Sequence, residues 1–213
     1  PSITSVTNSG PVNEGSPVTV NVTATDPGVN DPLTYYFDFN NDGVFEVIQS
    51  GSSASFTYSD NGSYTVRVQV RDKDGGASPI ATTTIIVNNV PPTVTALTAT
   101  PNPVNEGTPV SFSGAFTDPG TDTHTILWNF GDGVTATGTL TPTHAYADNG
   151  TYTVTLTVTD DDGGVGTRSL VVTVNNVPPT VTSLTATPNP ANEGQAVAFA
   201  GTFTDPGTTD THT

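Results

Sequence analysis

Apolar and polar residues alternate with a period of two along much of this chain. In residues 151–158, Thr alternates with Tyr, Val and Leu, which is the pattern of an antiparallel β-strand with one buried face. Residues 66–70 alternate in the same way, and residues 84–87 and 170–174 are further runs rich in β-branched side chains. Since no segment shows helical spacing, the pattern predicts an all-β fold.

Turn-forming residues separate these runs at short intervals. Asp-Pro-Gly, Asn-Gly and Gly-Gly sequences stand between the expected strands, and such sequences are typical of tight turns. About seven strands fit into a stretch of roughly 90 residues, which indicates a Greek-key β-sandwich of immunoglobulin type. Thr on the polar face of each strand accounts for the low charge content of the strands.

The chain contains internal repeats. Residues 88–120 align with residues 175–207, and 26 of the 33 positions are identical. Shorter matches extend the pattern to the first part of the chain, where Asn13-Glu14-Gly15 precedes its second and third copies by 92 and 179 residues. We therefore predict one repeat over residues 1–89, a second over 90–176, and the N-terminal part of a third over 177–213.

The third copy has too few strands to bury a core of its own. Three explanations of this incomplete third copy are compatible with the sequence. The segment is part of a longer array, it is a partly disordered tail, or another chain completes it by strand addition at its open edges. The last alternative would make the protein a self-assembling fibre whose partners are copies of the same chain.

The charge balance narrows the range of partners. Only 4 residues are Lys or Arg against 20 Asp or Glu, so the formal net charge is −16. Such a surface repels phosphate backbones and anionic lipids, which argues against nucleic acid and membrane surfaces as partners, and it suits divalent cations. The chain has no apolar run long enough to cross a membrane, so we expect no membrane insertion. It also has no Cys, which excludes disulfides and thiolate chemistry.

No group of residues in the sequence has the pattern of an enzyme active site. The three His residues lack a neighbouring nucleophile or metal-binding motif, and no Gly-rich phosphate loop precedes a helix. We therefore expect a protein without catalytic activity.

A first candidate calcium site lies in the first repeat. The sequence Asp38-Phe39-Asn40-Asn41-Asp42-Gly43 matches the start of a calcium loop, in which alternate oxygen-bearing side chains surround the ion and Glu46 follows. Against it, Gln49 stands where an EF-hand loop has its bidentate Glu. The candidate ligands of this loop are Asp38, Asn40, Asp42 and Glu46.

A second candidate calcium site lies where successive repeats join. In an immunoglobulin-like topology, two acidic loops of the second repeat share the end at which the Asn-rich linker enters, and a Glu of the first repeat should lie nearby. Carboxylates that converge there would repel one another unless a cation intervened. The alternative is that these Asp residues only stabilise turns. The candidate ligands are Glu14, Asn88, Asn89, Asp118, Asp160 and Asp162.

Four ordered motifs of the second repeat carry a family resemblance. Residues 128–133 read W-N-F-G-D-G, residues 142–146 P-T-H-A-Y, residues 150–154 G-T-Y-T-V, and residues 160–164 D-D-D-G-G. This order and spacing resembles the PKD (polycystic kidney disease) domain. The second repeat departs from the family pattern at Asn129, and the first has no Trp and carries Phe56 where His144 would align.

The resemblance implies a function. PKD-like repeats are expected to be extracellular, secreted or cell-surface modules that act as spacers or in interactions. We therefore expect a stalk, spacer or fibre-forming segment, and a polysaccharide-binding or adhesion module is the alternative. Sugar binding needs exposed aromatic rings, whereas Trp128 and Phe130 alternate with Asn129 and should both face the core. This favours the spacer.

Overall fold

The computed structural model describes residues 1–28 and 31–212, and their regular structure consists of β-strands. The strands up to residue 88 are β1 (Ser2–Asn8), β2 (Val12–Asn13), β3 (Pro17–Thr25), β4 (Thr34–Asp38), β5 (Val47–Gln49), β6 (Ser53–Thr57), β7 (Gly62–Arg71) and β8 (Ala81–Asn88). Those from residue 93 are β9 (Thr93–Thr100), β10 (Val104–Asn105), β11 (Pro109–Thr117), β12 (His124–Asn129), β13 (Thr135–Thr137), β14 (Thr143–Ala145), β15 (Gly150–Asp160), β16 (Val165–Asn175), β17 (Thr180–Thr187) and β18 (Ala198–Thr204). The all-β prediction is confirmed.

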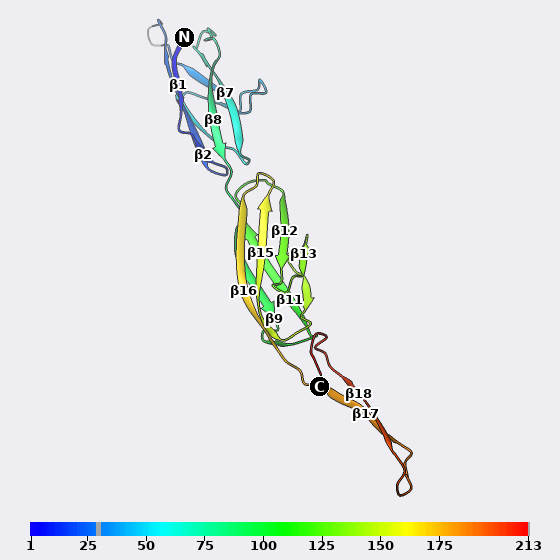
Figure 1. Ribbon diagram of the computed structural model, residues 1–213. Helices are drawn as coiled ribbons and strands as arrows, with labels where there is room; N and C mark the ends of the chain where they lie inside the picture. The colour runs from blue at the N-terminus through cyan, green and yellow to red at the C-terminus, as the bar shows by residue number, and fades with distance from the viewer. Residues whose placement is uncertain (29–30, 213) are drawn as a thin grey trace. The chain divides into compact units, whose positions relative to one another are not determined.

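The first repeat is a two-sheet sandwich. One sheet has the strand order β1-β3-β6, and the other has the order β2-β8-β7-β4-β5 (Figure 1). The long strands of the second sheet pair antiparallel, whereas the short β2 pairs parallel with the end of β8. The second repeat has the same arrangement, with sheets β9-β11-β14 and β10-β16-β15-β12-β13. Both have the immunoglobulin-like architecture that the sequence predicts.

The alternation seen in the sequence divides each strand between core and solvent. In β15, Val154, Leu156 and Val158 are fully buried and the Thr residues between them are half-buried. In the second repeat, Trp128 and Phe130 are also buried, while Asn129 is exposed. The prediction that both rings face the core is therefore confirmed, and they form the centre of the hydrophobic cluster of this repeat.

The third copy forms a single two-stranded sheet of β17 and β18. Phe199 and Phe203 of β18 are 73% and 50% exposed, although Phe112, the counterpart of Phe199 87 residues earlier, is only 2% exposed. Val181 and Leu184 of β17 are exposed as well. Within the described residues this hairpin thus buries no core, as its small number of strands led us to expect.

The chain forms two compact units. Unit 1 comprises Pro1–Pro92 together with the loops Asp118–Thr123 and Asp160–Gly164. Unit 2 comprises Thr93–Thr117, His124–Thr159 and Val165–Thr213. The repeat boundaries at 1–89, 90–176 and 177–213 remain a prediction from the sequence. In the part of the chain that the structure describes, no helix is long and apolar enough to cross a membrane.

Candidate metal centre

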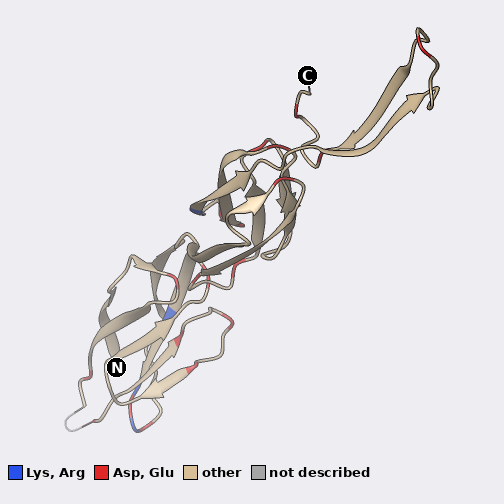
Figure 2. Cartoon of the chain, turned by 90° about the horizontal axis from the view of Figure 1, so that it is seen from below, with Lys and Arg blue, Asp and Glu red and all other residues tan. Residues whose placement is uncertain are grey.

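Acidic side chains lie mostly in loops and at strand ends, because the strand faces are occupied by Thr and apolar residues (Figure 2). Among the described residues of unit 1, three groups of carboxylates around the loop 118–123 each bring one oxygen per residue to within 4.8 Å of the others, and a separate fourth group lies in the loop after β4. Asp122, in the loop between β11 and β12, belongs to all three groups. The candidate metal centre of unit 1 is therefore built around this residue.

Glu14 follows β2 in a tight Asn-Glu-Gly turn. Gly15 has a φ of 69°, and a Cβ there would lie 3.1 Å from the Cβ of Pro119, so the turn needs glycine for both its conformation and its space. Only 1% of Glu14 is exposed. Its Oε1 accepts a hydrogen bond of 2.6 Å from the backbone N–H of Val90. Its Oε2 is buried and has no hydrogen-bond partner among the described residues.

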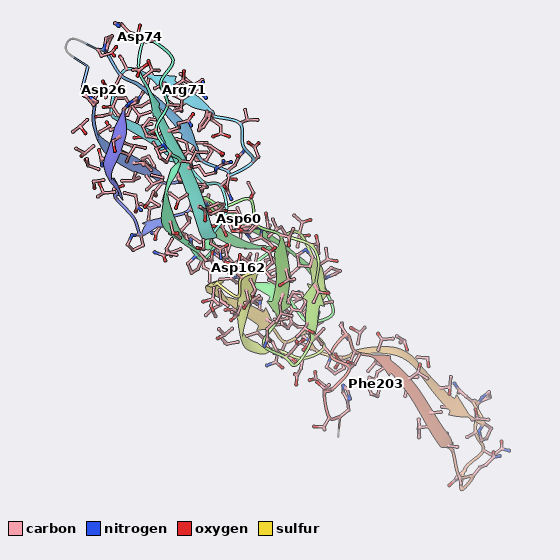
Figure 3. All side chains as sticks on the ribbon, turned by 90° about the horizontal axis from the view of Figure 1, so that it is seen from above. Asp26, Asp60, Arg71, Asp74, Asp162 and Phe203 are labelled. Atoms are coloured by element: carbon pink, nitrogen blue, oxygen red, sulfur yellow. The ribbon has the colours of Figure 1, made fainter. Side chains whose placement is uncertain are left out.

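Asp60 and Asp122 complete a group with Glu14, and one oxygen from each of the three lies within 4.8 Å of the others. Asp60 is in the turn between β6 and β7 and is labelled in Figure 3. The adjacent loops are held by the backbone N–H of Thr121, which donates to the carbonyl of Ser59 over 2.8 Å. Burial, together with the negative charges of Glu14 and other nearby carboxylates, raises the pKa of Asp122 to about 6. The group therefore holds unbalanced negative charge.

The second group consists of Asp118, Asp122 and Asp160. Asp160 is almost completely buried, and its Oδ2 accepts a hydrogen bond of 3.0 Å from the side-chain amide of Asn89. Its Oδ1 accepts from the backbone N–H groups of Asp162 and Gly164. Burial opposes ionisation, but these hydrogen bonds outweigh it and lower the pKa of Asp160. This carboxylate is therefore stabilised in its charged form without a metal.

The structure brings together most residues of the second predicted site. Glu14, Asp118 and Asp160 each share a group with Asp122, and Asp162 joins Asp122 and Asp161 in the third group. Asn89 contacts Asp160 through its side chain. Asn88 contacts Glu14 through its backbone carbonyl, which accepts from the N–H of Glu14 over 3.0 Å. Whether calcium binds there remains a prediction.

Sequence reasoning missed Asp60 and Asp122. A usable signal did exist, because both residues recur in the later copies. Asp60 is in an Asp-Asn-Gly turn that returns at Asp148, and Asp122 follows an Asp-Pro-Gly turn, as Asp210 does in the third copy. The sequence does not show directly that the two turns lie beside Glu14.

The same arrangement recurs inside unit 2. Glu106, Asp148 and Asp210 again each place one oxygen within 4.8 Å of the others, and Glu106 is 1% exposed. Oε1 of Glu106 accepts a hydrogen bond of 2.5 Å from the backbone N–H of Val177, and its Oε2 lacks a hydrogen-bond partner within the described residues. Burial and the charge of Glu106 raise the pKa of Asp210.

The calcium-like loop after β4 also brings its acids together. Asp38, Asp42 and Glu46 each offer an oxygen within 4.8 Å of the others, and Asp38 is fully buried. However, Oδ2 of Asp38 lies 3.4 Å from a guanidinium nitrogen of Arg67. Asn40 exchanges hydrogen bonds with Asp42, since its side-chain amide donates to Oδ2 and its Oδ1 accepts from the backbone N–H. Arg67 balances part of the charge of this loop, whereas Oδ1 of Asp38 is buried and has no hydrogen-bond partner among the described residues.

Solved structures similar to this chain include single PKD domains of two Vibrio proteins. The PKD1 domain of Vibrio anguillarum Epp is 28% identical, with 43% of this chain and 100% of that chain covered and a TM-score of 0.35. The PKD1 domain of the Vibrio cholerae metalloprotease PrtV is 32% identical, with 40% and 99% covered and a TM-score of 0.34. A structure of carbohydrate-binding modules of the β-sandwich superfamily is 28% identical, with 46% and 47% covered and a TM-score of 0.37. No curated protein sequence matches the chain.

The family comparison agrees with the motifs of the second repeat. The PKD domain model matches residues 1–87 and, as a second copy, residues 89–174. The two matches cover most of the chain and include all four motifs, from Trp128 to Gly164. The chain therefore belongs to the PKD domain family.

Proposed function

We propose that this chain is a non-catalytic spacer segment of a secreted or cell-surface protein. PKD domains are typically extracellular structural or binding modules without catalytic activity of their own. Two such domains in tandem would hold the parts attached to their ends at a distance. Each β-sandwich is stabilised by its own hydrophobic core, so the repeats suit a mechanical function.

The burial of aromatic side chains supports the spacer over a sugar-binding module. Between residues 1 and 174, every Tyr, Phe and Trp that the structure describes is buried or half-buried. A carbohydrate surface needs rings that are free to stack on sugars. In the two PKD repeats such rings are packed against one another instead, as in the stack of Phe130 on His144.

One observation favours binding as a second candidate function. Phe199 and Phe203 of β18 are the two exposed aromatic residues that the structure describes, and Phe203 is labelled in Figure 3. They could contact a polysaccharide, or they could contact another copy of this chain in a self-assembling fibre. Their counterparts in the second repeat, Phe112 and Phe116, belong to or pack against the core. Both rings therefore occupy positions that are core positions in the second repeat, and their exposure accompanies the lack of a core in the described part of the third copy.

Affinity electrophoresis through gels that contain neutral or acidic polysaccharides separates the two functions. A spacer migrates at the same rate with and without polysaccharide. Retardation that is lost in the double variant Phe199→Ser, Phe203→Ser would contradict the spacer and support the binding module. Sedimentation velocity of the same two proteins tests self-assembly, which predicts a concentration-dependent rise in mass for the wild type alone.

A further inference from the structure

We propose that the carboxylates of Glu14, Asp60 and Asp122, here called the Glu14 triad, bind a calcium ion. The same inference applies in unit 2 to the carboxylates of Glu106, Asp148 and Asp210, the Glu106 triad. The chain would then carry two equivalent cation sites, and each would be centred on the Glu of an Asn-Glu-Gly turn. This goes beyond the spacer function and does not depend on it.

The strongest support is a buried carboxylate oxygen without a partner in each triad. Oε1 of Glu14 and of Glu106 accepts a short hydrogen bond from a backbone N–H, which fixes the side chain. The other oxygen, Oε2, is buried in both residues and has no hydrogen-bond partner within residues 1–28 and 31–212. A desolvated carboxylate oxygen left in this state is costly, because it has lost its water and gained nothing. A cation ligated by this oxygen would offset that cost.

The negative charge around each triad also supports a bound cation. Three carboxylates converge, and among the described residues no Lys or Arg forms an ion pair with Glu14, Asp60 or Asp122. A divalent cation would remove the repulsion and favour the ionised form of all three groups.

The repetition shows that the arrangement is specific. The two triads consist of different residues in different units, yet they share the same residue types, the same buried Glu and the same hydrogen bond to its Oε1. Glu193 occupies the equivalent position in the third copy, where the given sequence contains no counterpart of Asp60 and Asp148.

The ligand atoms of the two triads favour calcium over magnesium. Every ligand atom of the two triads is a carboxylate oxygen, which suits a hard cation, and calcium accepts irregular oxygen shells more readily than magnesium does. The space beside each Glu carboxylate depends on a nearby glycine. A Cβ at Gly120 would lie 3.0 Å from Cδ of Glu14, and one at Gly207 would lie 3.0 Å from Cδ of Glu106. Glycine at both positions therefore leaves the space beside the Glu carboxylate free.

Isothermal titration of calcium chloride into the EDTA-stripped chain tests the proposal. We compare the wild type with Glu14→Gln and Glu106→Gln, which keep the carbonyl that accepts the backbone hydrogen bond and remove the charge. Each variant should lose one equivalent of calcium or bind it at least about tenfold more weakly, and the double variant should lose two. Glu193→Gln is the matched control and should bind like the wild type. Glu14→Gln and Glu106→Gln that both bind like Glu193→Gln would overturn the proposal.

Thermal unfolding separates a cation site from a purely structural Glu. In EDTA, Glu14→Gln should be at least as stable as the wild type, because it removes an uncompensated buried charge. In calcium, the wild type should gain more stability than the variant. An equal loss of stability in EDTA and in calcium would instead assign Glu14 a structural role alone. Magnesium in place of calcium should give a smaller gain, and an equal gain would contradict the selection of calcium.

Discussion

The backbone N–H of Val90 donates a hydrogen bond of 2.6 Å to Oε1 of Glu14. The two residues are 76 positions apart, and the bond joins the turn after β2 to the segment that follows β8. Val177 and Glu106 repeat the same bond in unit 2. One oxygen of each Glu is thereby used to fix the chain, and the other remains available for a cation.

Replacing Glu14 with Ala should separate the effect of this hydrogen bond from that of the charge. Glu14→Ala leaves the N–H of Val90 without its acceptor, whereas Glu14→Gln retains one. In EDTA we expect Glu14→Ala to be less stable than Glu14→Gln by about 1–3 kcal/mol. Urea unfolding of both variants measures the difference, and equal stabilities would show that the hydrogen bond contributes nothing.

Asp122 should make stability depend on pH when calcium is absent. Its pKa is raised from 3.8 to about 6 in the folded chain, so the folded state holds the proton more tightly than the unfolded state does. The resulting stabilisation is complete below about pH 4 and is lost as the pH rises through 6. Asp122→Asn removes this contribution.

Thermal unfolding in EDTA from pH 4 to pH 7 checks the effect of Asp122. The stability of the wild type relative to Asp122→Asn should fall across this range, and calcium should reduce the fall. A difference between the two proteins that stays constant with pH would contradict the raised pKa.

Trp128 should be the most sensitive core position of the second repeat. Its ring is fully buried and its Nε1 donates to the carbonyl of Thr139 over 2.9 Å. Trp128→Ala should cost about 3–5 kcal/mol in the free energy of unfolding, because it leaves a large cavity. Leu127→Ala is the matched control, since Leu127 is 42% exposed and should cost far less. Similar losses from both variants would contradict the assigned orientation of β12.

His144 should tolerate replacement by Phe. In the second repeat His144 stacks on Phe130 at 4.3 Å between ring centroids, and in the first repeat Phe56 stacks on Phe39 at 4.9 Å. His144→Phe keeps the stacking and loses the contact with Asp132. Chemical unfolding should show a loss of no more than about 1 kcal/mol. A loss comparable with that of Trp128→Ala would show that the interaction with Asp132 dominates.

The fold was predictable because its signals are local. The alternation in β7 and β15, the Gly-containing turns and the repeats all lie within short stretches of sequence, and together they specify a sandwich. The inward placement of Trp128 and Phe130 follows from the same period of two. Phe56 aligns with His144 in the sequence, and the structure gives both rings the same stacking role.

The acidic centre was only partly predictable because its contacts are long-range. Glu14, Asp118 and Asp160 could be placed from the immunoglobulin-like topology, which fixes the end of the sandwich at which each loop lies. Asp60 and Asp122 could not, because their approach to Glu14 depends on how two turns 62 residues apart come together. The burial of Oε2 of Glu14 is also a property of packing, so no sequence pattern reveals it.

Small-angle X-ray scattering of the wild-type chain in calcium and in EDTA tests the combined account most directly. A spacer whose acidic loops are held by calcium should give different scattering curves in the two buffers, with a narrower spread of conformations in calcium. The double variant Glu14→Gln, Glu106→Gln should give the same curve in both buffers. Superimposable wild-type curves in calcium and in EDTA would contradict the account.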